Sequence, residues 1–136
     1  MPKAFVDTSV ILRILIKDDE LKAQAAVNLL KSAAERDVTL YLLPVAVLET
    51  VWVLEKVYSL SRKDVQEVVE AILNTPELRV EKEGVFRKAL QTYVEKNIKF
   101  ADAVMGYWGL ANGYNIVFTY DEKDFKRIEG LDARKP

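Results

Sequence analysis

Hydrophobic residues recur along the chain in two patterns. Short apolar runs are typical of buried strands, and they alternate with longer stretches in which apolar residues return every three or four positions, as on one face of a helix. Within residues 19–36, for example, Leu21, Ala25, Leu29 and Ala33 recur at helical spacing. The short runs predict strands over residues 4–6, 39–43, 78–80 and 115–119. The periodic stretches predict helices over residues 9–17, 19–36, 45–58, 62–74, 84–97 and 101–112.

Capping residues support several of these boundaries. Ser61 is suited to cap the helix that begins at Arg62, and Asn112-Gly113 is a typical helix end. Strands that alternate with helices predict an α/β fold with a short, mainly parallel sheet. No repeat or flexible linker interrupts the sequence, so we expect a single domain over residues 1–136 with a short polar tail after about residue 129.

The predicted sheet brings in a first chemical observation. In parallel sheets, ligands bind in the crevice beyond the carboxyl ends of the strands. Asp7 directly follows the first predicted strand, Ala4-Phe5-Val6, which we expect to be buried, and Asp121 lies just past the last strand. If the first and last strands are neighbours, both carboxylates lie at the same end of the sheet.

Composition narrows the possible chemistry. The 136 residues carry a net charge of −1 and contain neither cysteine nor histidine. Disulfides, thiolate zinc sites, cysteine nucleophiles and histidine-based triads are therefore excluded. The five glycines match no phosphate-binding loop, and the balanced charge excludes a polybasic nucleic-acid surface. No secretion signal or membrane-length apolar run is present, which predicts a cytoplasmic protein.

Three acidic residues stand alone in the three most apolar stretches of the chain. Asp7 is the only charged residue between Lys3 and Arg13, and Asp102 is the only one between Lys99 and Asp121. Glu49 likewise stands alone between Asp37 and Glu55. Solubility does not need a charge at these places, so they are candidate functional residues.

Each lone acid also has a plainer interpretation. On a helix, the neighbours of Glu49 at three and four positions are Val45, Ala46, Trp52 and Val53, which predicts a carboxylate on an apolar face, unless its side chain reaches water at the helix edge. Asp7 is placed to cap a helix, and Asp102 to stabilise the first turn of one.

Two further acids follow the last predicted strand, in the segment Thr119-Tyr120-Asp121-Glu122-Lys123-Asp124-Phe125. A charged loop is usually only solvated, but this one lies where a parallel sheet binds ligands. Carboxylates brought together repel one another unless a cation is present. A set of Asp and Glu without His or Cys favours Mg²⁺ or Mn²⁺ over zinc, and such an ion can activate a water beside a scissile phosphate.

Four short segments together carry a family resemblance. They are Phe5-Val6-Asp7-Thr8-Ser9, Pro44 to Thr50 with Leu48-Glu49-Thr50, Phe100-Ala101-Asp102-Ala103, and Thr119-Tyr120-Asp121 leading to Asp124-Phe125. In order and spacing, over essentially the whole chain, they resemble the PIN domain, and most closely the VapC-type toxin ribonucleases.

The resemblance implies a three-layer α/β/α sandwich and cleavage of single-stranded RNA that leaves 5′-phosphate and 3′-hydroxyl ends. It implies a negative pocket that binds Mg²⁺ or Mn²⁺ through Asp7, Glu49, Asp102 and a fourth acid, for which Asp121 is preferred to Asp124. Thr8 or Ser9 and Thr119 are expected to orient these ligands through their hydroxyls. It also implies a homodimer and a small antitoxin partner. Contacts with such partners are one role for Trp52, Val57 and Tyr58, although core packing is the favoured expectation for them.

Other interpretations stay open. Flanking cations could hold RNA phosphates, although a solvated surface explains each of them equally well: Arg13, Lys17, Lys99, Lys123, Lys126 and Arg127. A PIN-type nuclease with a housekeeping role in RNA processing is one alternative to the toxin, and a non-catalytic interaction module whose acids are caps is another. A phosphatase with Asp7 as nucleophile would need a second Asp two residues later, where Ser9 stands.

Overall fold

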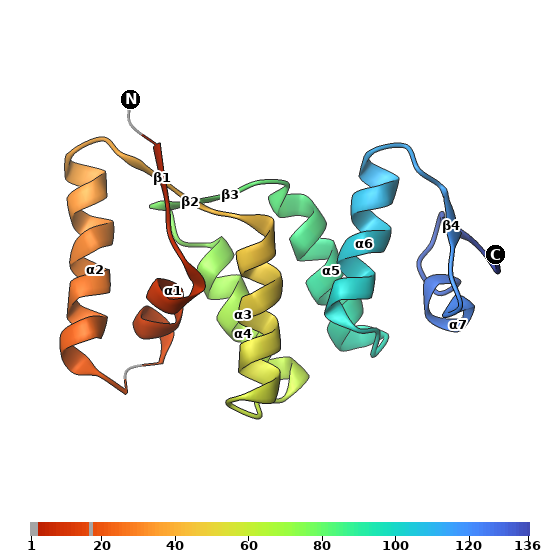
Figure 1. Ribbon diagram of the computed structural model, residues 1–136, viewed down its shortest axis with the longest axis horizontal. Coiled ribbons are helices and arrows are strands. Elements are labelled where there is room, and N and C mark those ends of the chain that lie inside the picture. Colours follow the sequence, from red (N-terminus) through yellow and green to blue (C-terminus); the bar gives the residue numbers. More distant parts are fainter. Residues whose placement is uncertain (1–2, 17) are drawn as a thin grey trace. The chain divides into compact units, whose positions relative to one another are not determined.

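A computed structural model describes residues 3–16 and 18–136 (Figure 1). The chain divides into two compact units, Met1–Glu81 and Lys82–Pro136. Both units are built from short parallel strands and helices, so the predicted α/β class is confirmed. The prediction of a single domain over residues 1–136 stays a prediction.

The first unit is a three-stranded parallel sheet with helical connections. The strands lie in the order β1-β2-β3, with Ala4 paired to Leu40 and Tyr41 paired to Arg79. Because the strands are parallel, the segments that follow them leave from the same edge of the sheet. The elements along the chain are β1 (Lys3–Phe5), α1 (Thr8–Leu15), α2 (Glu20–Glu35), β2 (Thr39–Leu42), α3 (Pro44–Lys56), α4 (Arg62–Leu73) and β3 (Leu78–Val80).

The second unit begins with two packed helices and ends with a two-stranded parallel sheet. Its elements are α5 (Glu83–Glu95), α6 (Phe100–Ala111), β4 (Ile116–Phe118), α7 (Glu122–Phe125) and β5 (Asp132–Arg134). The α5–α6 interface is aromatic: the Phe86 and Phe100 rings stack at 6.4 Å, and Tyr93 meets Phe100 edge-on at 5.8 Å. In the sheet, Val117 pairs with Ala133.

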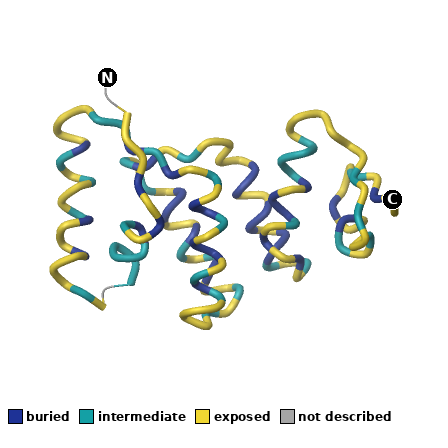
Figure 2. The backbone as a smooth tube through the Cα atoms, in the orientation of Figure 1, coloured by how far each residue is buried: buried dark blue, intermediate teal, exposed yellow. Residues whose placement is uncertain are grey.

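Helical periodicity explains most of the core. Figure 2 shows buried positions returning at intervals along the helices, with exposed positions between them. The fully buried residues of the first unit include Leu42, Val47, Leu54, Val65 and Val69, at the spacing expected for inward helix and strand faces. Among residues 3–16 and 18–136, no helix combines the length and apolar character that a membrane span needs.

Most predicted boundaries agree with the structure to within one or two residues. The Ser61 Oγ accepts a hydrogen bond from the Asp64 N–H at 3.2 Å, as expected of a helix cap. Gly113 adopts a φ of +82° just after α6, which confirms the predicted helix end. The helix predicted over residues 9–17 begins at Thr8 and ends at Leu15, and Lys17 lies outside the described residues.

Three expectations were wrong. The first strand was expected to be buried, yet Lys3, Ala4 and Phe5 are all exposed, and only Val6 after them is buried. The segment 122–125 is the short helix α7 rather than a loop. The polar tail contains strand β5, whose Asp-Ala-Arg sequence has no apolar run to indicate a strand.

Candidate metal centre

Helix α6 holds Asp102 in its first turn. The helix begins at Phe100, and its buried residues Phe100, Ala103 and Val104 fix it in the core of the second unit. Asp102 lies in the same turn but is only half-buried, unlike Phe100, Ala103 and Val104. Its carboxylate is therefore held on a rigid element.

Two further carboxylates come from the segment after β4. The Thr119 Oγ1 accepts a hydrogen bond from the Asp121 N–H at 2.8 Å, which fixes the turn leading into α7. Asp121 precedes the first residue of α7, and Asp124 lies one turn later. The buried side chains of Phe125 and Ile128 anchor this short helix in the second unit.

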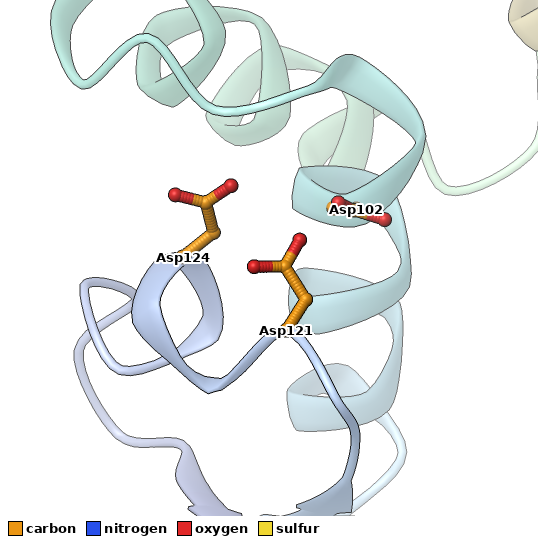
Figure 3. A group of neighbouring side chains, drawn as sticks. All are labelled: Asp102, Asp121 and Asp124. Carbon is orange, nitrogen blue, oxygen red and sulfur yellow. The ribbon is translucent and has the colours of Figure 1, made fainter.

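These three side chains converge. One carboxylate oxygen each from Asp102, Asp121 and Asp124 lies within 4.8 Å of the others. Figure 3 shows Asp121, in the turn before α7, and Asp124, on α7, beside the helix that carries Asp102. The sequence left a choice between Asp121 and Asp124, and the structure brings both to Asp102. We call these three residues the aspartate cluster.

The electrostatics of the aspartate cluster are unfavourable without a cation. Burial raises the pKa of Asp102 most strongly, and the negative charges of Asp121 and Asp124 raise it further, while Lys99 opposes the shift. Three carboxylates without nitrogen or sulfur donors suit a hard divalent cation such as Mg²⁺ or Mn²⁺, which prefers oxygen ligands and keeps part of its water shell. The donor chemistry of the cluster therefore fits the predicted ion.

Asp7 lies in the first unit, where it caps α1. Its Oδ2 accepts hydrogen bonds from the Ser9 hydroxyl at 2.6 Å and from the Ser9 N–H at 3.1 Å. The hydroxyl bond, followed by the backbone bond, lowers the pKa of Asp7 below its usual value. The capping interpretation of Asp7 is thus confirmed, and the side chain is exposed and held ionised at neutral pH. A cap does not exclude a second role, because a carboxylate has further lone pairs.

Thr8 and Ser9 have different roles in the structure. Thr8 is buried, and its hydroxyl donates to the Ala46 carbonyl of α3 at 3.5 Å. Ser9 contacts the Asp7 carboxylate directly. Of the two hydroxyls predicted to orient Asp7, the structure therefore identifies that of Ser9, while Thr8 joins α1 to α3.

Glu49 corrects one expectation. It lies on α3, one turn after Ala46, but its side chain is exposed rather than placed on a buried apolar face. Its neighbours Val45 and Trp52 are exposed as well, at 67% and 57%. The apolar composition of that helix face was mistaken for burial. A role for Glu49 in the site stays a prediction, as does that of Asp7.

Comparison with known proteins places this α/β chain in a family. The sequence profile of the PIN domain matches residues 4–131, a span that includes the aspartate cluster, Asp7 and Glu49. The chain is also 27% identical over 123 residues to the VapC ribonuclease of Aquifex aeolicus (strain VF5), and the match covers 90% of each chain. The protein belongs to the PIN domain family, and the predicted resemblance to VapC-type proteins is confirmed.

Proposed function

We propose that this protein is a Mg²⁺- or Mn²⁺-dependent endoribonuclease that cleaves single-stranded RNA. The observation that carries the proposal is the convergence of Asp102, Asp121 and Asp124 to within 4.8 Å in a chain of the PIN domain family. The similarity to a VapC ribonuclease supports RNA as the substrate. Asp7 and Glu49 are proposed to act together with the aspartate cluster as further ligands or catalytic acids.

The reaction we propose is hydrolysis of a phosphodiester. A water oxygen forms a bond to phosphorus, the bond from phosphorus to O3′ breaks, and a proton passes to O3′, which leaves a 5′-phosphate and a 3′-hydroxyl. A bound divalent cation supplies a water of lowered pKa and stabilises negative charge on the phosphate. Asp102, Asp121 and Asp124 would hold that cation.

The residues around the acids prepare them for this role. The Thr119 hydroxyl fixes the backbone of Asp121, and the buried side chains of Phe125 and Ile128 fix that of Asp124. The Ser9 hydroxyl orients the Asp7 carboxylate. Preorganised ligands bind a cation and a substrate phosphate without the cost of reordering at each turnover.

We further propose that the protein is the toxin of a type II toxin–antitoxin pair, a homodimer in the cytoplasm that a small antitoxin protein inhibits. The similarity to a VapC ribonuclease supports this assignment. Core packing was the favoured expectation for Trp52, Val57 and Tyr58, and it was wrong, because they are 57%, 63% and 37% exposed. Such apolar exposure on α3 and the turn after it is available for protein contacts. A small open reading frame just upstream of the gene would support the toxin, and its absence would favour a housekeeping RNA-processing nuclease.

A cleavage assay tests the proposed reaction. A pool of single-stranded RNAs is incubated with the protein in Mg²⁺ and in EDTA, and the products are mapped at nucleotide resolution. We expect cleavage in Mg²⁺ only, and none from Asp102→Asn. Full cleavage by a folded Asp102→Asn protein would contradict the assignment. If the wild type neither cleaves RNA nor binds Mn²⁺ in calorimetry, the chain is a non-catalytic interaction module.

A further inference from the structure

Arg127 is held by a reciprocal contact beside the aspartate cluster. Its Nη2 donates a hydrogen bond to the Lys96 carbonyl at the end of α5, and the Lys96 Nζ donates to the Arg127 carbonyl at 2.7 Å. These two bonds join residues 31 positions apart. One end of the guanidinium is therefore fixed on the backbone.

Another nitrogen of the same guanidinium, Nη1, lies near the aspartate cluster. Its Nη1 lies 3.7 Å from the Asp124 Oδ1, which is an ion pair but too long for a hydrogen bond. Within the described parts of the chain, Nε and Nη1 donate no hydrogen bond to protein, and the side chain is 43% exposed. Arg127 thus has donors left over next to the proposed cation ligands.

The neighbouring cations lack this arrangement. Lys126 lies 3.2 Å from Glu122, and its side chain is 62% exposed, so it is a solvated surface pair. Lys99 is exposed, and its positive charge lowers the pKa of Asp102. Of the three described cations Lys99, Lys126 and Arg127, Arg127 alone combines a backbone anchor with an ion pair to the aspartate cluster.

We propose that Arg127 binds a non-bridging oxygen of an RNA phosphate next to the aspartate cluster. This inference rests on the proposed function, and it assigns to Arg127 the positioning of the RNA substrate. The guanidinium can donate from Nε or Nη1 to a phosphate oxygen while Nη2 stays bonded to the Lys96 carbonyl, whereas the single ammonium nitrogen of a lysine cannot divide these two contacts between separate nitrogens. Because Lys96 already holds this side chain, little rotamer entropy is lost when the phosphate binds. The positive charge of Arg127 also offsets the repulsion between the carboxylates of the aspartate cluster and the RNA backbone.

The test compares Arg127→Gln with Arg127→Lys and with Lys126→Gln, a control that loses the same charge one residue away. Binding of a fluorescein-labelled single-stranded RNA is measured by fluorescence anisotropy in EDTA, over a series of salt concentrations. Arg127→Gln should weaken binding about tenfold and lower the salt slope by about 0.7, the value for one phosphate contact to a single strand. Arg127→Lys should keep the slope but bind more weakly than wild type, and Lys126→Gln should change binding by less than about twofold.

Calorimetry with Mn²⁺ on the same proteins separates substrate binding from ligand positioning. We expect Arg127→Gln to bind Mn²⁺ as tightly as wild type or more tightly, because a competing cation has left Asp124. Loss of Mn²⁺ binding would overturn the proposal, since Arg127 would then only hold Asp124 in place. Wild-type RNA affinity in Arg127→Gln would also overturn it. If the Gln variant fails to fold, Arg127→Lys alone decides, because wild-type affinity there contradicts a need for the guanidinium. Wild-type protein that binds Mn²⁺ but cleaves no RNA would reject the proposed reaction, whereas the RNA affinities measured in EDTA decide the role of Arg127 separately.

Discussion

Gly106 on α6 lies directly against Ile128, which follows α7. A Cβ added at Gly106 would stand 2.7 Å from the Ile128 Cδ1 and 3.0 Å from the Leu131 Cδ1. Ile128 is fully buried, so it has little room to move. The absence of a side chain at Gly106 therefore allows the segment that carries Asp121 and Asp124 to approach the helix that carries Asp102.

Substitution of Gly106 should disturb the aspartate cluster without touching it. We expect Gly106→Val to lower the free energy of unfolding by about 1–3 kcal/mol through overpacking, and to weaken Mn²⁺ binding because α7 is displaced. Gly84→Val is the matched control, since nothing lies within 4 Å of a Cβ at Gly84, and it should change stability by less than about 0.5 kcal/mol. Chemical denaturation and calorimetry measure both effects. Equal behaviour of the two variants would refute this account of the packing.

Asp102→Asn should raise the melting temperature by a few degrees in metal-free buffer at neutral pH. Asp102 has a raised pKa, so its ionised form destabilises the fold above that pKa, and protonation at lower pH removes the cost. The difference between variant and wild type should therefore shrink as the pH falls. Addition of Mn²⁺ should reverse the order, because wild type gains more from binding the ion. A lower melting temperature for the variant in EDTA would show that the cluster is not under repulsion.

Two substitutions of Asp7 separate its capping role from its proposed catalytic role. Asn caps a helix about as well as Asp, so Asp7→Asn should melt near wild type, whereas Asp7→Ala should melt several degrees lower. Both should lose RNA cleavage by more than the roughly 10–100-fold typical of residues that only support a ligand. Cleavage at the wild-type rate by Asp7→Asn would leave Asp7 as a helix cap and nothing more.

Thr119 is expected to act through Asp121. Thr119→Val removes the acceptor of the Asp121 N–H while keeping the shape of the side chain. We expect a several-fold loss of Mn²⁺ affinity, with a stability change of about 1 kcal/mol, the usual net worth of one hydrogen bond. Thr119→Ser restores the hydroxyl and should restore the affinity. Unchanged affinity in the Val variant would mean that α7 alone orients Asp121.

The sequence predicted most elements because local signals and tertiary packing agree. The Ser61 cap and the Gly113 helix end are encoded within a few residues, and so are the periodic faces of α2 and α4. Burial was less predictable. Phe5 and Trp52 are apolar, yet they are 70% and 57% exposed, because exposure depends on which elements cover a face and not on the composition of that face.

The sequence predicted part of the aspartate cluster, because two of its residues have local signals. Lone acids in apolar stretches identified Asp102, and a position after a strand identified Asp121. Asp124 was preferred less than Asp121, and residues 122–125 contain too few apolar residues to predict the helix that carries Asp124. The sequence offered Arg127 only as one of six flanking cations, because the backbone carbonyl that anchors its side chain lies 31 residues away.

Calorimetric titration with Mn²⁺ tests most directly whether the aspartate cluster is a metal centre. Wild type is compared with Asp102→Asn, Asp121→Asn and Asp124→Asn, and with Asp132→Asn as a control that loses an exposed carboxylate paired to Arg134 outside the cluster. We predict that wild type and Asp132→Asn bind Mn²⁺ alike, and that each cluster variant binds it at least about tenfold more weakly. Equal Mn²⁺ affinity in all five proteins would contradict the central claim.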